Sequence, residues 1–156
     1  MTSNILKELS RYNISTYADI IYRNALMIPD EEAFVYGNQR ISFSGFNGRV
    51  NRLVNSLKSM GIKKGEVLGL LSWNCLECND VNGAAMKGGY IVAPFNPRLQ
   101  VDELEYLINY SEAGTLFIGP DLHDTVERLR PRLPKVKNYI NFGDSIPDML
   151  SHHEML

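Results

Sequence analysis

Three short polar loops follow predicted strands, and they carry the side chains best suited to binding a ligand. The loops are Ser72-Trp73-Asn74, residues 94–98 and Gly119-Pro120-Asp121. Because open parallel sheets bind ligands beyond the carboxyl ends of their strands, we expect these loops to line one crevice. Arg98 is the best candidate for contacting an anion, since a guanidinium offers forked donors to phosphate. Proline and asparagine also make turns, so a purely structural role, with Arg98 as a solvated surface arginine, stays open.

Cys75 and Cys78 form a CxxC pattern directly after a predicted strand. In thioredoxin-type sites the first cysteine lies at a helix N-terminus, which lowers its pKa. This copy departs from that pattern, because Asn74 separates Trp73 from Cys75 and Leu-Glu replaces Gly-Pro. Free cysteine is among the most buried residue types, so we favour two small buried side chains on a helix. A zinc site would need a second pair of ligands at suitable spacing, and we assign no metal ligand.

A basic stretch lies between residues 128 and 137 and is interrupted by Pro131 and Pro134. Its members are Arg128, Arg130, Arg132, Lys135 and Lys137. Such a run is usually a solvated face, although it could also steer a phosphorylated ligand. His152 and His153 are adjacent but lie in a tail without a clear pattern. The chain has no GxxxxGK[ST] loop, no GxGxxG after a strand and no GxSxG elbow.

Hydrophobic periodicity predicts the elements that position these loops. We expect a helix over 13–27 capped by Ser15 or Thr16, then a hairpin of strands 33–36 and 40–43 around Gly37-Asn38. A helix capped by Ser44 should end at Gly61. Beyond it, helical patterns over 76–87, 101–108 and 122–129 alternate with strand patterns over 67–71, 91–93, 115–118 and 138–142.

This alternation of strand and helix patterns predicts the fold class and the organisation of the chain. We expect a three-layer, Rossmann-like α/β domain with a mainly parallel sheet, helices on both faces and an N-terminal β-hairpin. Residues 1–143 should form one α/β subdomain, with 144–156 as a tail or the start of a continuation. By themselves, these residues predict a soluble α/β domain with a ligand-binding edge.

Composition narrows the class of protein. The 156 residues are 44% hydrophobic and 22% charged, as in an ordinary globular domain, and the net charge of −2 does not favour nucleic acid. No apolar run approaches the ~20 residues of a membrane span. Residues 1–4 do not open a signal peptide, and two cysteines do not make a disulfide framework. We therefore expect a cytoplasmic protein.

An ordered set of motifs over residues 13–142 resembles the adenylate-forming enzymes, the superfamily that includes the acyl-CoA synthetases. The family's opening helix and first strand are similar to residues 16–21 and 29–34. The continuation of its second core motif is similar to residues 102–113. Residues 41–46 take the place of the first core motif, L-T-Y-x-E-L, with Gly45 replacing the acidic residue. Residues 61–67 resemble G-[VI]-x-x-G-[DE]-x-V, and 87–97 resemble the second core motif, K-A-G-x-x-x-x-P-[LI]-[ND]-P. Asn96-Pro97-Arg98-Leu99 favours the acyl-CoA synthetase branch.

The resemblance implies the N-terminal part of a longer ligase that activates a small-molecule carboxylate with ATP and Mg²⁺ and passes the acyl group to CoA. In that family the phosphate loop, adenine site, acyl pocket and catalytic lysine come later in the chain. We therefore assign no catalytic residue, and we expect this chain alone to be inactive and to bind none of these cofactors tightly. By position, the resemblance suggests Phe95, Asn96, Pro97 and Arg98 as part of the rim that receives the CoA nucleotide.

Two other classes of function stay open. One is a stand-alone nucleotide- or CoA-binding module, and the other is a redox protein that uses Cys75 and Cys78. An incomplete sheet would also leave an unpaired edge, at which a homodimer could form.

Overall fold

A computed structural model of the protein describes residues 14–144 and 146–156. The chain divides into two compact units, with the division between Gly48 and Arg49. No helix within the described ranges is long and apolar enough to cross a membrane.

The first unit contains a helix and the predicted hairpin. Helix α2 (Tyr17–Met27) begins after Thr16, whose backbone N–H donates to the Asp19 carboxylate at 2.8 Å in a capping box. Asn13, the predicted start of this helix, lies outside the described residues. Strands β1 (Glu32–Tyr36) and β2 (Gln39–Ser42) pair antiparallel on either side of Gly37-Asn38, which confirms the hairpin.

Helix α3 (Phe43–Ser59) begins earlier than predicted. The Ser42 hydroxyl accepts a hydrogen bond from the Gly45 backbone N–H at 3.2 Å, so Ser42 caps the helix and the prediction of Ser44 is wrong. The other end follows the prediction: Gly61 has φ +83°, and the Ile62 N–H donates to the Leu57 carbonyl at 3.1 Å. Only glycine adopts this left-handed conformation readily.

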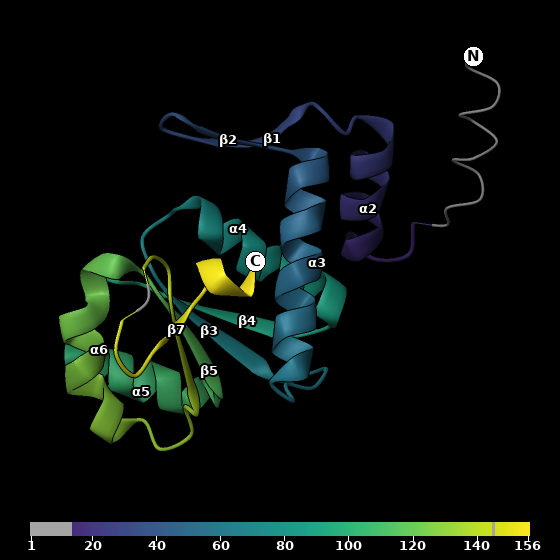
Figure 1. Ribbon diagram of the computed structural model, residues 1–156. Helices are drawn as coiled ribbons and strands as arrows, with labels where there is room; N and C mark the ends of the chain where they lie inside the picture. The colour runs from purple at the N-terminus through teal and green to yellow at the C-terminus, as the bar shows by residue number, and fades with distance from the viewer. Residues whose placement is uncertain (1–13, 145) are drawn as a thin grey trace, which may run out of the picture. The chain divides into compact units, whose positions relative to one another are not determined.

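The second unit contains a five-stranded sheet in the order β4-β3-β5-β6-β7 (Figure 1). Its strands are β3 (Val67–Leu71), β4 (Ile91–Phe95), β5 (Thr115–Ile118), β6 (Asn138–Asn141) and β7 (Leu150–Ser151), and every pair is parallel. Helices α4 (Leu76–Gly88), α5 (Val101–Ser111) and α6 (His123–Leu129) connect them. Short 3₁₀ turns are η1 (Pro120–Leu122), η2 (Arg130–Arg132) and η3 (His153–Met155).

Both faces of this sheet are covered. Side chains of α5 and α6, among them Leu104 and Val126, share one buried cluster with Leu71, Leu116 and Ile118 of the strands. Residues that alternate with these along the strands, such as Leu68 and Phe117, are equally buried, so they face the opposite side of the sheet. Figure 1 shows α4 and the C-terminal half of α3 on that side. The predicted three-layer arrangement is therefore confirmed.

Two segments differ from the sequence-based expectation. Strand β4 continues through Pro94 and Phe95, where we predicted a loop. The sheet tolerates Pro94 because β4 is an edge strand, paired among the described residues with β3 alone. In the tail, β7 pairs with β6, and Met149, Ser151 and His152 are buried. The described part of 144–156 is therefore packed rather than frayed.

A buried carboxylate connects three segments of this unit. Asp80 of α4 has no exposed surface, and Arg49 of α3 donates to both of its oxygens, with Nη2 2.6 Å from Oδ2. His152 Nε2 lies 3.4 Å from the same oxygen. Burial alone would raise the pKa of Asp80, but the contacts with His152 and Arg49 outweigh it and lower that pKa.

We predict that Asp80→Asn lowers the free energy of unfolding by about 3 kcal/mol at neutral pH, because Arg49 then stays partly buried without its counter-charge. A carboxyl group with a lowered pKa contributes stability above its unfolded pKa and loses it as the pH falls through the folded value. The difference between wild type and variant should therefore be complete above about pH 4 and shrink below it. Urea unfolding at several pH values measures this difference, and exposed Asp121→Asn is the control. A pH-independent difference would contradict the argument.

Candidate functional site

The carboxyl ends of β3, β4 and β5 lie at one level of the sheet. Leu71 is paired in register with both Phe95 and Ile118, the last residues of the neighbouring strands. The three polar loops therefore start side by side, as we predicted from the open-sheet rule.

Arg98 and Trp73 bring two of these loops into contact. The Arg98 guanidinium carbon lies 5.3 Å from the centroid of the Trp73 ring, within cation–π range. Asn96 Oδ1 accepts a hydrogen bond from the Arg98 backbone N–H at 3.0 Å, a local turn that fixes the base of the arginine. Within the described ranges Arg98 forms no ion pair with an acidic side chain. An exposed aromatic ring beside a free guanidinium can contact both a flat ring system and an anionic group.

The four residues suggested for a nucleotide rim differ in their exposure. Asn96 and Arg98 are exposed, and Pro97 is half-buried. Phe95 is only 7% exposed, because its side chain packs into the core cluster beneath α5. The side chains available at this rim therefore come from residues 96–98, while Phe95 anchors the end of the strand.

The third loop is held against the first by a glycine. The Gly119 N–H donates to the Leu71 carbonyl at 2.9 Å, which ties the end of β5 to the end of β3. A Cβ at Gly119 would lie 2.7 Å from Ser72 Oγ, so a larger residue would push the two loops apart. Pro120 and Asp121 then turn outward and are exposed.

His123 and Asn141 form a polar contact at the same edge that we did not predict. Asn141, the last residue of β6, is buried, and its Nδ2 donates to the Asp144 carbonyl at 2.6 Å. Its Oδ1 accepts from His123 Nε2 at 2.6 Å. A histidine at the start of a short helix and an asparagine at the end of a strand carry no joint signal in the sequence. Their pairing follows only from the order of β5 and β6 in the sheet.

Much of the basic stretch is already neutralised by ion pairs. Arg132 forms ion pairs with Asp102 and Glu105 of α5, and Lys135 Nζ lies 2.7 Å from Glu112 Oε1. The Arg130 guanidinium lies over the Tyr139 ring at 4.3 Å from its centroid. These contacts favour a structural role for these three side chains over steering of a ligand.

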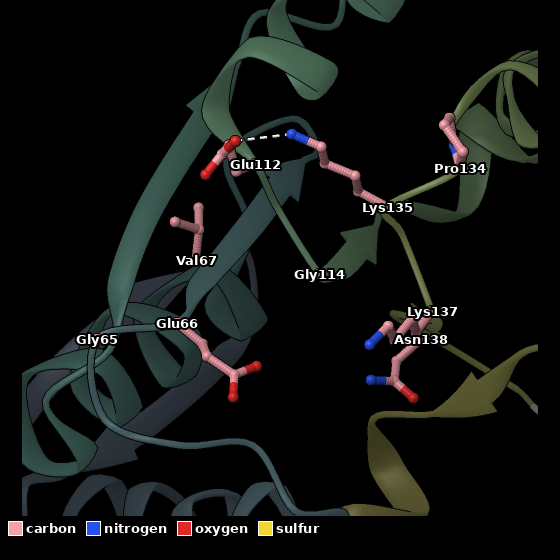
Figure 2. A pocket seen from close by; sticks show the side chains of 9 residues that line it. All are labelled: Gly65, Glu66, Val67, Glu112, Gly114, Pro134, Lys135, Lys137 and Asn138. Atoms are coloured by element: carbon pink, nitrogen blue, oxygen red, sulfur yellow. Dashed lines mark hydrogen bonds and ion pairs between the residues drawn. The ribbon is translucent and has the colours of Figure 1, made fainter.

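A cavity of about 520 Å³ lies at the opposite, amino-terminal edge of the sheet (Figure 2). Its wall includes Val67 and Asn138 at the starts of β3 and β6, with Lys135, Glu112 and Glu66 around it. Figure 2 shows the Lys135 ammonium group pointing toward Glu112, with which it forms an ion pair, so its charge is already neutralised. This cavity is therefore distinct from the carboxyl edge that the sequence singles out.

The two cysteines lie side by side, and neither is fully buried. Both side chains are half-buried, so our preference for two buried cysteines is wrong. Cys75 is the N-cap residue of α4, and its Sγ lies 3.3 Å from Cys78 Sγ.

The two neighbouring histidines of the C-terminal segment both lie close to acidic side chains. His152 lies beside Asp80, and His153 Nε2 lies 3.5 Å from Glu77 Oε1. Across the described ranges, no three His, Cys, Asp or Glu side chains gather as a metal site.

Residues 21–152 match the family model of the AMP-binding enzymes. This match covers most of the chain and includes every loop of the carboxyl edge. The chain belongs to the AMP-binding enzyme family.

Two curated relatives illustrate the family. The long-chain-fatty-acid–CoA ligase of Thermus thermophilus is 26% identical over 118 residues, which are 75% of this chain and 22% of that protein. The medium/long-chain-fatty-acid–CoA/3-oxocholest-4-en-26-oate–CoA ligase of Mycobacterium marinum is 28% identical over 127 residues, which are 81% of this chain and 23% of that protein. The chain spans less than a quarter of either relative.

Solved structures share the fold. The anthranilate CoA ligase AuaEII in complex with anthranoyl-AMP superposes with a TM-score of 0.85 at 24% identity, covering 94% of this chain and 29% of that one. The N-terminal domain of FACL13 from Mycobacterium tuberculosis gives a TM-score of 0.77 at 23% identity, covering 81% and 34%. The three-layer arrangement therefore occurs within larger members of this fold.

We predict that Arg98→Ala increases quenching of Trp73 fluorescence by acrylamide, because the guanidinium shields one face of the indole. Trp73 is the single tryptophan of the chain, so the tryptophan emission reports the surroundings of this ring. Arg128→Ala, which removes another exposed arginine, is the matched control and should leave quenching unchanged. Equal quenching of Arg98→Ala and wild type would show that the stack does not form in solution.

Proposed function

We propose that this chain is the N-terminal part of an ATP-dependent acid–CoA ligase. The family match over residues 21–152 is the observation that carries this proposal. In the proposed reaction a carboxylate oxygen attacks the α-phosphorus of ATP and pyrophosphate leaves. The thiol of CoA then attacks the acyl carbon and AMP leaves. Relatives named for fatty acids and a sterol acid support a carboxylic acid as the substrate class.

In this proposal the described residues provide a scaffold and one rim of the active site. Phosphoryl chemistry needs fixed positive charge around the reacting phosphate, held in a site that excludes water. Trp73 is 44% exposed and Arg98 is also exposed, so the carboxyl edge does not enclose a reacting group. The groups that bind Mg²⁺ and the triphosphate would come from other parts of the enzyme.

We predict that the purified chain alone does not catalyse carboxylate-dependent exchange between pyrophosphate and ATP, whereas a full-length enzyme containing it does. Radiolabelled pyrophosphate incorporation into ATP measures both, with and without a panel of carboxylic acids. Exchange by the chain alone would contradict its proposed role as a scaffold. Saturable ATP or CoA binding by the chain without exchange would instead favour the stand-alone binding module.

The rim formed by Asn96, Pro97 and Arg98 is the part that we propose contacts the CoA nucleotide. The Arg98 guanidinium, which forms no ion pair among the described residues, suits a phosphate, and the neighbouring Trp73 ring suits the face of an adenine. Asn96 contributes by holding the turn, since its Oδ1 accepts the Arg98 N–H.

We predict that Arg98→Ala in the full-length enzyme weakens CoA binding about tenfold, the order of one hydrogen bond to a charged group. Isothermal titration with CoA measures the affinity. The pyrophosphate exchange rate should stay unchanged, because CoA enters after the adenylate forms. Arg128→Ala is the matched control for the loss of a positive charge. Unchanged CoA affinity in Arg98→Ala would exclude this rim while leaving the ligase proposal intact.

Two expectations stay predictions, the cytoplasmic location and a homodimer. A homodimer through an edge of the described sheet would pair β4 or β7, its two outer strands, and in β4 Pro94 lacks the backbone N–H that a partner strand needs.

A further inference from the structure

Cys75 and Cys78 are placed by the backbone so that their sulfur atoms face each other. Cys75 is the N-cap of the 13-residue helix α4, with φ −151° and ψ 175°, and Cys78 lies in the first turn. Residues three apart near a helix start lie on the same side, and here the two Sγ atoms are 3.3 Å apart. A disulfide needs a sulfur separation of about 2 Å, so the two sulfur atoms have to move closer for the bond to form.

The surroundings favour ionisation of one thiol. Cys75 can donate a hydrogen bond to Cys78 Sγ across the 3.3 Å between them, whereas the Trp73 carbonyl, 3.4 Å from Cys78 Sγ, accepts only from the protonated thiol. The hydrogen bond from Cys75 lowers the pKa of Cys78 to about 6, although burial and the Glu77 carboxylate oppose this. The same contact raises the pKa of Cys75, with burial adding to the effect. Both side chains keep access to solvent.

We propose that Cys75 and Cys78 form a reversible intramolecular disulfide by exchange with a low-molecular-weight disulfide such as glutathione disulfide. The Cys78 thiolate attacks one sulfur of glutathione disulfide, and one glutathione thiolate leaves. Cys75 then loses its proton and attacks Cys78 Sγ, which releases the second glutathione. The balance is two protein thiols and one glutathione disulfide converted to one protein disulfide and two glutathione thiols.

This modification site is independent of the proposed ligase reaction. The pair lies at the start of α4, directly after the loop that holds Trp73, and no step of the ligase proposal uses either sulfur. The proposal rests on the orientation of two side chains, and it holds or fails whatever the activity of the whole enzyme.

The test equilibrates the 156-residue chain with mixtures of reduced and oxidised glutathione. Acid quenching, maleimide labelling and intact mass then separate three products. The reduced chain takes up two labels, the mixed disulfide carries one glutathione and one label, and the internal disulfide carries neither. The chain has only two cysteines, so every label reports this pair. We expect the internal disulfide to predominate, with an equilibrium constant at least about tenfold higher in native buffer than in urea.

Two variants test whether both sulfurs are needed. Cys75→Ser keeps a good N-cap residue and leaves Cys78 alone, so it should stop at the mixed disulfide. Cys78→Ser leaves Cys75 alone and should stop at the mixed disulfide as well. Circular dichroism verifies that each native sample is folded. Full labelling of both thiols, persistence of mixed disulfides alone in the wild type, or equal constants in native buffer and urea would overturn the proposal.

Discussion

Asp80 is a carboxylate without exposed surface, and its charge has to be paired with side chains from other parts of the chain. Arg49 donates hydrogen bonds to it from two nitrogen atoms, and His152 Nε2 lies 3.4 Å from its Oδ2. Breaking a buried ion pair is strongly destabilising, so this contact ties the second half of α3, helix α4 and the C-terminal segment to one another. Because α4 starts immediately after the 72–74 loop, this contact also fixes the position of the loop at the carboxyl edge.

The sheet could be predicted because its strands are apolar without alternation. Val67–Leu71 and Thr115–Ile118 are buried on both faces, as parallel strands between two layers of helices must be. Once the strands are known to be parallel, their carboxyl ends share an edge, so the meeting of the polar loops also follows from the sequence. Pro94 is the exception, since proline usually ends a strand, and only the edge position of β4 lets the strand continue.

Side-chain partners could not be predicted in this way. Hydrophobic periodicity shows which face of an element is buried, but it does not show which polar groups meet. Arg49 and Asp80 are 31 residues apart and His152 lies much further along, so no local pattern relates them. Arg98 and Trp73 come from separate loops, and their contact depends on loop conformation. The apolar residues of 146–156 show no helical or strand period, and β7 forms because β6 offers it a free edge.

The distribution of charge explains why this part of the fold suits a rim better than a catalytic centre. Asp102, Glu105 and Glu112 neutralise Arg132 and Lys135 on the α5 side, and Asp80 neutralises Arg49 in the interior. Arg98, at the carboxyl edge, keeps its charge beside an exposed indole. A single solvated guanidinium can bind the outer phosphate of a ligand, but stabilising a transition state takes several charges fixed in a site closed to water. The carboxyl edge therefore fits the rim that we propose, and the proposed bond-breaking steps would require further charged groups from elsewhere in the enzyme.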